Sequence, residues 1–190
     1  RLLKTEPLLP QKSSGIYINR ELSLLSFNER VLSLAQDRSI PILERLKYLC
    51  IVANNLDELF EIRVAGLKAR SHEEPVDSKL PDGLTIEETL TILGKRTQSL
   101  VQLQYDILNQ SVLPELKKEG INVLNYHELN NQQKRWASAY FKNNVLPILT
   151  PLGLDPLHPF PKVLNKSLNF IIEMRGKDSY GRKGRVAIVQ

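Results

Sequence analysis

Three long runs of apolar residues at three-to-four-residue spacing constrain the fold of this 190-residue chain most strongly. They begin near Ile16, Pro41 and Ile86. Such spacing places apolar side chains along one face of an α-helix. Because long helices with short connections pack side by side, we expect residues 16–120 to form an antiparallel helical bundle.

The first pattern predicts a helix whose start has two candidates. Its expected buried residues are Leu22, Leu25, Phe27, Val31, Leu32 and Leu34. Ser26 and Glu29 have the spacing of a capping box, in which a hydroxyl and a carboxylate satisfy the first N–H groups of a helix. A start near Asn19 fits as well, so the sequence leaves this boundary open.

The second pattern predicts one helix from about Pro41 to Arg70, because proline suits the first turn of a helix. The expected apolar face consists of Leu46, Leu49, Ala53, Leu56, Phe60, Val64 and Leu67. The expected polar face carries Glu44, Arg45, Lys47, Asn54, Asp57, Glu58, Glu61 and Lys68. A charged loop from Ser71 to Gly83 follows.

The third pattern predicts a helix that begins at a capping box formed by Thr85 and Glu88. Its apolar face consists of Ile86, Leu90, Leu93, Thr97, Leu100, Leu103 and Ile107. Pro114 is expected to kink or restart this helix. Gly120 is expected to end it, since glycine is favoured just after a helix.

The pattern changes after Gly120 to short strands around one further helix. Residues 121–124 are expected to form a strand, and Asn130 with Gln133 to open a helix that runs to about Val145. Residues 168–172 and 185–189 are expected to form two strands joined by a hairpin loop. The chain stops at Gln190 inside a strand pattern, which suggests an unpaired sheet edge and a piece of a longer polypeptide.

These patterns predict an α+β chain with three parts. We expect a loose leader over residues 1–15, a helical domain over 16–120, and the first part of a mixed α/β domain over 121–190. The composition, 42% apolar and 25% charged, is ordinary for a globular protein and excludes a disordered tail or a membrane-embedded bundle. A single cysteine, Cys50, excludes a disulfide framework and fits a reducing compartment.

The net charge of +5 lies entirely after Phe160, where seven basic residues face two acidic ones. The basic residues are Lys162, Lys166, Arg175, Lys177, Arg182, Lys183 and Arg185. Such a segment favours polyanions such as nucleic acid, an acidic membrane or a phosphate polymer. A solvated hairpin surface explains the same residues, so the partner stays open.

No complete active site is visible in the sequence. His72, His127 and His158 are far apart and lack the spacing of metal ligands. The segment from Gly181 to Gly184 is too short for a phosphate-binding loop. Asp57, Glu58 and Glu61 with Arg63 form a carboxylate cluster that a solvated helix face explains better than a metal site.

The most unusual local feature is the pair Asn54–Asn55 inside the second predicted helix. Asparagine is unfavourable there because its amide competes for backbone groups. Either the helix breaks, and one asparagine caps its restart with Asp57 or Glu58 at the third position, or the amides face a ligand. The donor and acceptor of an asparagine amide match the edge of adenine.

Three blocks together resemble the N-terminal domain of bacterial polyphosphate kinases: residues 21–32, 41–49 and 54–65. The segment from Ile121 through residues 150–155 to the strand at Phe170 resembles the start of that family's head domain. One departure is Leu24, where the family usually has tryptophan. We expect Leu24 to pack in the bundle core.

The resemblance implies an enzyme that reversibly transfers the γ-phosphate of ATP to the end of polyphosphate through a phosphohistidine. The histidine, the ligands of Mg²⁺ and the phosphate-binding arginines would all lie outside this chain, so the fragment alone would be inactive. The resemblance places a contact with the ATP base on Asn55. Asn54 and Arg63 are possible neighbours of that site, although Arg63 is equally suited to pair with Glu58 or Glu61.

The resemblance also implies partners and a location. We expect ATP or ADP, inorganic polyphosphate, a homo-oligomer and a cytoplasmic location. The resemblance leaves association with the inner membrane open. Nucleic acid is not expected. The alternative is a non-enzymatic helical module that binds a polyanion or nucleic acid through the basic C-terminal segment.

Overall fold

The structure is a computed structural model that describes residues 17–154, 159–164, 166–176 and 186–190. The chain divides into two compact units, one ending at Val123 and the other beginning at Leu124. We call them the helical unit and the second unit and describe each by itself.

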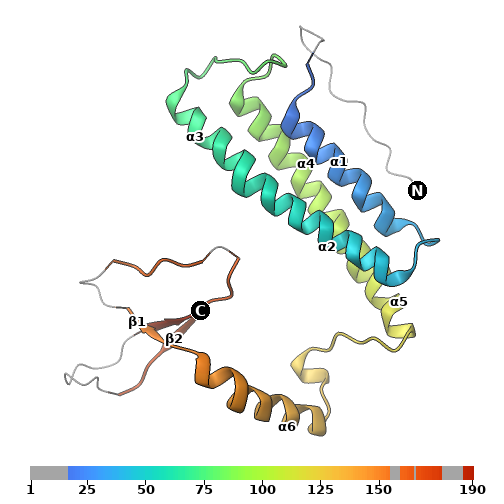
Figure 1. Cartoon of the computed structure of the whole chain (residues 1–190), viewed down its shortest axis with the longest axis vertical. Helices are drawn as coiled ribbons and strands as arrows, with labels where there is room; N and C mark the ends of the chain where they lie inside the picture. The colour runs from blue at the N-terminus through green and yellow to red at the C-terminus, as the bar shows by residue number, and fades with distance from the viewer. Residues whose placement is uncertain (1–16, 155–158, 165, 177–185) are drawn as a thin grey trace. The chain divides into compact units, whose positions relative to one another are not determined.

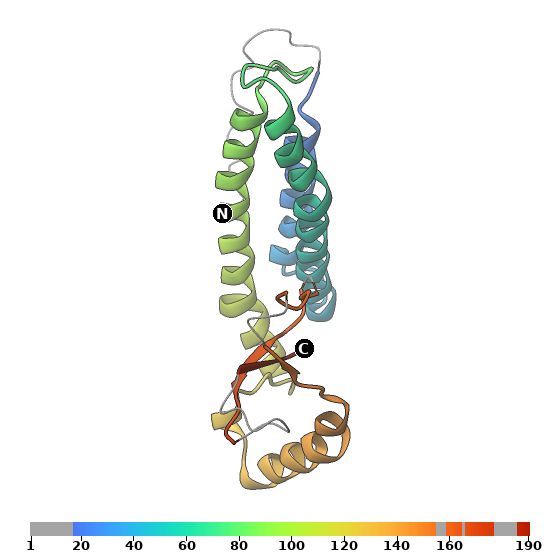
Figure 2. The same ribbon diagram turned by 90° about the vertical axis from the view of Figure 1, so that its left-hand side faces the viewer.

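The helical unit consists of three antiparallel helical rods, shown side by side in Figures 1 and 2. The first rod is α1 (Arg20–Gln36). The second joins α2 (Ile42–Glu58), the π-helical η1 (Leu59–Val64) and α3 (Ala65–Glu73). The third joins α4 (Ile86–Ile107), the π-helical η2 (Leu108–Val112) and α5 (Leu113–Lys118). The expected antiparallel bundle is therefore confirmed.

The first rod begins at the earlier of the two predicted starts. The side chain of Asn19 accepts a hydrogen bond from the Leu22 amide at 3.0 Å. Ser26 lies within α1, where its hydroxyl donates to the Leu22 carbonyl at 3.0 Å. At the other end, the hydroxyl and the amide of Ser39 donate to Asp37 and hold the pKa of this carboxyl below its usual value of 3.8.

Three residues expected in the core of the first rod are exposed instead. Leu24, Phe27 and Leu34 are 38%, 48% and 39% exposed. Each lies two residues after a leucine that is buried, and two residues turn an α-helix by about 200°. The expected core positions of Phe27 and Leu34, and the expected packing of Leu24, are therefore wrong.

The second rod is helical without a break from Ile42 to Glu73, so it extends beyond the predicted end at Arg70. The predicted cap at Asn54 or Asn55 is wrong, because both residues lie inside α2. Phe60 is 41% exposed, against expectation, whereas its neighbour Leu59 is 2% exposed. The π-helical segment η1 adds residues to a turn, and this changes which side chains face the core.

The third rod has the predicted signals at both ends. Thr85 and Glu88 form the capping box, with hydrogen bonds of 3.1 and 2.8 Å. Pro114 stands in the first turn of α5 directly after η2, so the helix restarts there. Gly120, with a φ of +81°, ends the rod, and the Ile121 amide donates to the Leu116 carbonyl at 2.9 Å.

The second unit starts with short helices and ends in a small sheet. Its helical segments are η3 (Tyr126–Glu128), α6 (Asn131–Tyr140), η4 (Phe141–Val145) and η5 (Leu146–Ile148). The antiparallel sheet has the order β1 (Leu152–Gly153), β3 (Val186–Val189), β2 (Phe170–Glu173). Ile171 pairs with Ile188. This confirms the α+β class, with Asn130 and Gln133 capping α6 as predicted.

Two strand predictions in the second unit are wrong. Residues 121–124 form no strand and have no described strand as a partner. The C-terminal strand, expected at an unpaired edge, is β3, which pairs with both β1 and β2. The leader of residues 1–15, His158, the segment from Gly181 to Gly184 and most of the basic C-terminal segment lie outside the described residues.

Candidate functional site

The asparagine pair lies in the last turns of α2, immediately before η1. Val52 and Leu56 are 0% and 6% exposed and anchor this part of α2 in the core. Asn54 is exposed, whereas Asn55 is half-buried. The packing of α2 therefore separates the roles of the two amides, because only Asn55 lies at the boundary between core and solvent.

The partner of Asn55 is Asn28 of α1. The Asn55 Nδ2 donates to the Asn28 Oδ1 at 2.8 Å. Asn28 is 2% exposed and lies on the buried face of α1, between Leu25 and Val31. An asparagine amide has two N–H donors and a carbonyl with two lone pairs, so this bond uses only part of the capacity of Asn55. The half-buried amide can therefore also contact a ligand.

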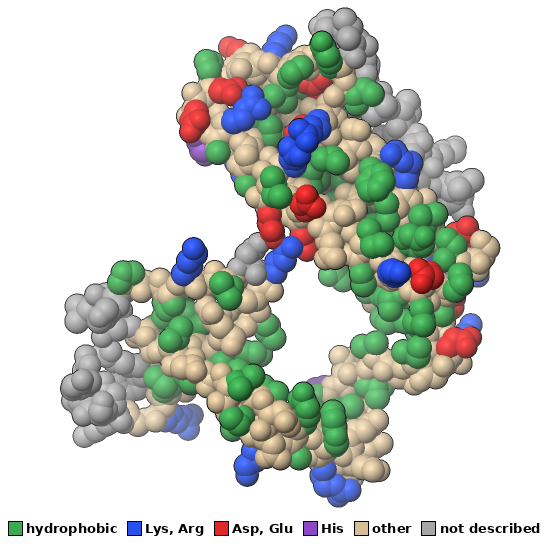
Figure 3. Space-filling model, viewed as in Figure 1, with side chains coloured by type: hydrophobic (Ala, Val, Ile, Leu, Met, Phe, Trp, Pro, Cys, Tyr) green, Lys and Arg blue, Asp and Glu red, His purple; other side chains and the backbone are tan. Residues whose placement is uncertain are grey.

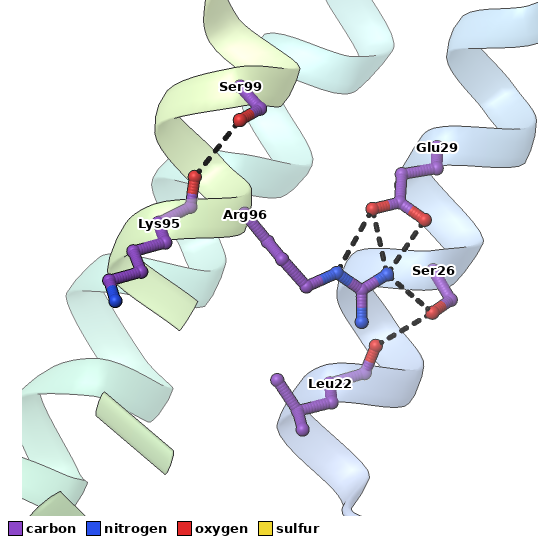
Figure 4. Close-up of polar contacts among 6 residues, drawn as sticks. All are labelled: Leu22, Ser26, Glu29, Lys95, Arg96 and Ser99. Atoms are coloured by element: carbon purple, nitrogen blue, oxygen red, sulfur yellow. Dashed lines mark hydrogen bonds and ion pairs between the residues drawn. The ribbon is translucent and has the colours of Figure 1, made fainter. Parts of the chain in front are cut away.

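The orientation of α1 is fixed on its other side by a charged contact with α4. The Arg96 guanidinium lies 2.7 and 2.8 Å from the two carboxylate oxygens of Glu29 and donates to the Ser26 hydroxyl at 3.0 Å, as Figure 4 shows. Consecutive residues of an α-helix point about 100° apart. While Glu29 is held against α4, Asn28 is thus directed toward α2.

Arg63 lies in η1, eight residues beyond Asn55, which corresponds to ~12 Å along a helix axis. Its side chain is half-buried. Within the described residues, none of the ion pairs involves Arg63, so the predicted pairs with Glu58 or Glu61 do not form there. The structure does not bring Arg63 and Asn55 into contact.

The other predicted candidates do not assemble into a site. Glu58 and Glu61 are exposed, and Asp57 is half-buried. In the part of the chain that the structure describes, no group of three or more His, Cys, Asp or Glu side chains is placed to hold a metal ion. His72, at the end of α3, and His127, in η3, are both exposed, as is Cys50.

A shallow hollow of about 440 Å³ lies beside the loop before α4. Its lining includes the carboxylates Asp77, Glu87 and Glu88 and excludes Asn54, Asn55 and Arg63. Three carboxylates repel phosphate groups, so this hollow does not suit a nucleotide. No helix among the described residues combines the length and apolar character needed to cross a membrane.

Sequence reasoning missed Asn28 and Arg45. Asn28 stands three residues after Leu25 and three before Val31, which is the spacing of the buried face. A pattern of apolar residues alone does not reveal this position, because asparagine is polar. Arg45, assigned to the polar face, is 1% exposed and lies in the core.

Comparisons with known proteins agree over nearly the whole chain. The polyphosphate kinase N-terminal domain family matches residues 17–124, and the polyphosphate kinase middle domain family matches residues 132–190. Polyphosphate kinases of Burkholderia multivorans and Paraburkholderia phytofirmans are each 48% identical over 173 residues, which is 91% of this chain. The comparisons give the nucleic-acid-binding alternative no support.

A solved structure supports the same assignment. The crystal structure of polyphosphate kinase from Porphyromonas gingivalis matches 94% of this chain with a TM-score of 0.71 and 25% identity. The chain spans about a quarter of the length of these relatives, 25% in each case. The resemblance of the three sequence blocks is thereby confirmed, and the chain belongs to the polyphosphate kinase family, covering its N-terminal domain and part of its middle domain.

Proposed function

We propose that this chain supplies one wall of the ATP site of a polyphosphate kinase and that Asn55 contacts the base. The whole enzyme would reversibly transfer the γ-phosphate of ATP to the end of polyphosphate through a phosphohistidine. The histidine and the magnesium ligands would belong to parts of the enzyme outside this chain. The chain alone would therefore not catalyse the reaction.

The observation that carries this proposal is the placement of Asn55. Its amide is half-buried on a continuous helix and is held by one hydrogen bond to Asn28. An amide held in this way keeps donor and acceptor capacity for the N–H and ring nitrogen of adenine. A cap function for Asn55 no longer competes with this interpretation, because no helix begins there.

The test is kinetic and uses a full-length polyphosphate kinase that carries this sequence. Asn55→Ala removes the amide, and a lost neutral hydrogen bond of ~1 kcal/mol raises the KM for ATP about fivefold. The KM for polyphosphate should change less. Asn109→Ala is the matched control, because Asn109 has the same side chain at an exposed position of η2 on another rod. An unchanged KM for ATP with a lowered melting temperature would contradict the proposal.

Arg63 and Asn54 are proposed only as neighbours of this site. Arg63 is a cation on the same rod, and the absence of an ion pair within the described residues leaves it suited to an anionic group of the ligand. Formation of a homo-oligomer, a cytoplasmic location and association with a membrane surface stay predictions from the family resemblance.

A further inference from the structure

We propose that Asn28 is a positioning residue for the nucleotide: it sets the orientation of the Asn55 amide from inside the bundle. This inference rests on the proposed contact between Asn55 and the base of ATP. It adds a residue that does not itself touch the ligand and that lies on a different helix.

The first observation is that Asn28 occupies a core position at which an apolar residue would be expected. It is 2% exposed and stands on α1 between Leu25, which is 0% exposed, and Val31, which is 9% exposed. Burying an amide is unfavourable unless it forms hydrogen bonds. Its Oδ1 accepts the 2.8 Å hydrogen bond from the Asn55 Nδ2, which offsets part of this cost.

The second observation is that the two amides differ in their access to solvent. Asn28 is buried, so a ligand cannot reach it, whereas Asn55 is half-buried. The acceptor oxygen of Asn28 fixes which end of the Asn55 amide carries the donor. Without that acceptor, the amide of Asn55 can turn over by 180° about its last torsion and exchange its donor and acceptor.

Recognition of adenine requires the Asn55 amide to keep its donor and acceptor in one orientation, because adenine offers one donor and one acceptor at a fixed spacing. A guanine base presents a different arrangement at the corresponding edge. An Asn55 amide held in one orientation therefore discriminates between ATP and GTP, and an amide free to turn over discriminates less. Asn28 acts on specificity through Asn55, and α1 is kept in register by the contact of Glu29 with Arg96 (Figure 4).

The test compares three substitutions in a full-length polyphosphate kinase that carries this sequence. Asn28→Leu keeps the size and removes the acceptor, whereas Asn28→Asp keeps an acceptor oxygen. We expect Asn28→Leu to lower the ratio of kcat/KM for ATP to kcat/KM for GTP about three- to tenfold, mainly through the KM for ATP. Asn28→Asp should restore most of the ratio. Thr85→Ala removes the N-cap of α4, which the proposal does not use, and should lower the melting temperature without changing the ratio.

A double substitution tests whether Asn28 acts through Asn55. If Asn28 acts through Asn55, Asn28→Leu with Asn55→Ala should show the same ratio as Asn55→Ala alone. Additive losses would overturn the inference, as would an unchanged ratio in Asn28→Leu when Asn55→Ala lowers it. If Asn55→Ala itself leaves both the KM for ATP and the ratio unchanged, the result contradicts the proposed contact of Asn55 with the base of ATP, on which this inference rests.

Discussion

Arg45 illustrates at the scale of a single residue how a charge can occupy the core of this bundle. Its Nε donates to the Ala35 carbonyl at 2.8 Å, and its two terminal nitrogens reach Glu115 at 2.6 Å and Ser111 at 2.7 Å. The Ala35 carbonyl belongs to the last turn of α1, where carbonyls lack helical partners and attract cations. One side chain therefore links all three rods.

In the ion pair of Arg45 with Glu115, removal of Glu115 should destabilise the bundle more than removal of Arg45. The Arg45 side chain is 2% exposed and that of Glu115 is 31% exposed. Glu115→Ala leaves a buried, uncompensated charge and should lower the free energy of unfolding by about 3–5 kcal/mol. Arg45→Met should cost less, because Glu115 can then be hydrated. Urea unfolding followed by circular dichroism measures both effects.

The matched control for this pair lies on the surface of the same helix. Lys47 is 3.7 Å from Glu44, and their side chains are 67% and 53% exposed. Lys47→Ala should change the free energy of unfolding by less than about 0.5 kcal/mol, because water screens an exposed pair. A cost for Arg45→Met equal to or above that of Glu115→Ala would contradict this account of the buried pair.

At the scale of elements, the π-helical segment η1 decides which side chains of the second rod reach the core. The buried residues here are Leu56 before η1, Leu59 and Val64 at its two ends, and Leu67 after it. The interval from Leu59 to Val64 is five residues, longer than the three or four of a regular helix. In a regular helix, Phe60 would share the buried face of Leu56, four residues earlier. With the longer interval, Leu59 faces the core and Phe60 is exposed.

A pair of alanine substitutions tests whether η1 turns Leu59 rather than Phe60 toward the core. Leu59→Ala should lower the free energy of unfolding by about 2–5 kcal/mol, as expected for a buried leucine. Phe60→Ala removes a larger side chain that is 41% exposed, so it should cost less than Leu59→Ala. Urea unfolding of the two variants gives the comparison. The opposite order would show that the second rod continues as a regular helix through Phe60.

Alanine should have opposite effects on stability at two glycines, one inside the third rod and one just after its end. Gly120 has a φ of +81°, and Gly94 lies inside α4; an added Cβ meets no atom within 4 Å at either position. Gly120→Ala should therefore destabilise by ~1 kcal/mol through backbone strain alone. Gly94→Ala should stabilise by about 0.5–1 kcal/mol. Melting temperatures that move in the same direction would contradict the assigned helix end.

The sequence predicted elements better than the details of their packing. The capping signals at Thr85 and Asn130 and the stop at Gly120 are local, so they could be read directly. The burial of Asn28 and Arg45 depends on partners 27 and 70 residues away. No local pattern reveals such partners. The same is true of η1, whose extra turn residues change the phase without altering helical composition.

For the same reason, the candidate site could be predicted only in part. The pair Asn54–Asn55 was unusual enough to be singled out from the sequence. Which of the two amides is half-buried, and that Asn28 holds it, follows only from how α1 and α2 pack. The family resemblance selected Asn55 without giving this physical reason.

At the scale of the whole molecule, the two units differ greatly in how much core they have. The hydrophobic core of the helical unit contains 17 buried residues. In the described part of the second unit, the buried residues are Ala187, Ile188 and Val189 of β3. Hydrophobic side chains remain at the surface along α6 (Figure 3), including Trp136, which is 67% exposed and stacks on Tyr140 at 5.3 Å. Since burial of apolar area drives folding, the second unit should be the less stable.

This difference predicts two separate unfolding transitions in the 190-residue chain. Trp136 is its single tryptophan and reports on the second unit, whereas circular dichroism at the helical band reports mainly on the helical unit. The aromatic signal of Trp136 and Tyr140 should be lost at a lower urea concentration than the helical signal. Superimposable transitions would mean that the two units unfold together.

Substitution of the N-cap residues in each unit sharpens this experiment. Asn130 caps α6 and Thr85 caps α4, each through a capping box. Replacing a capping side chain with alanine costs ~1 kcal/mol. Asn130→Ala should therefore move only the transition of the aromatic signal, and Thr85→Ala only that of the helical signal. If either substitution shifts both transitions equally, the units are energetically coupled, and the small core of the second unit is not what limits its stability.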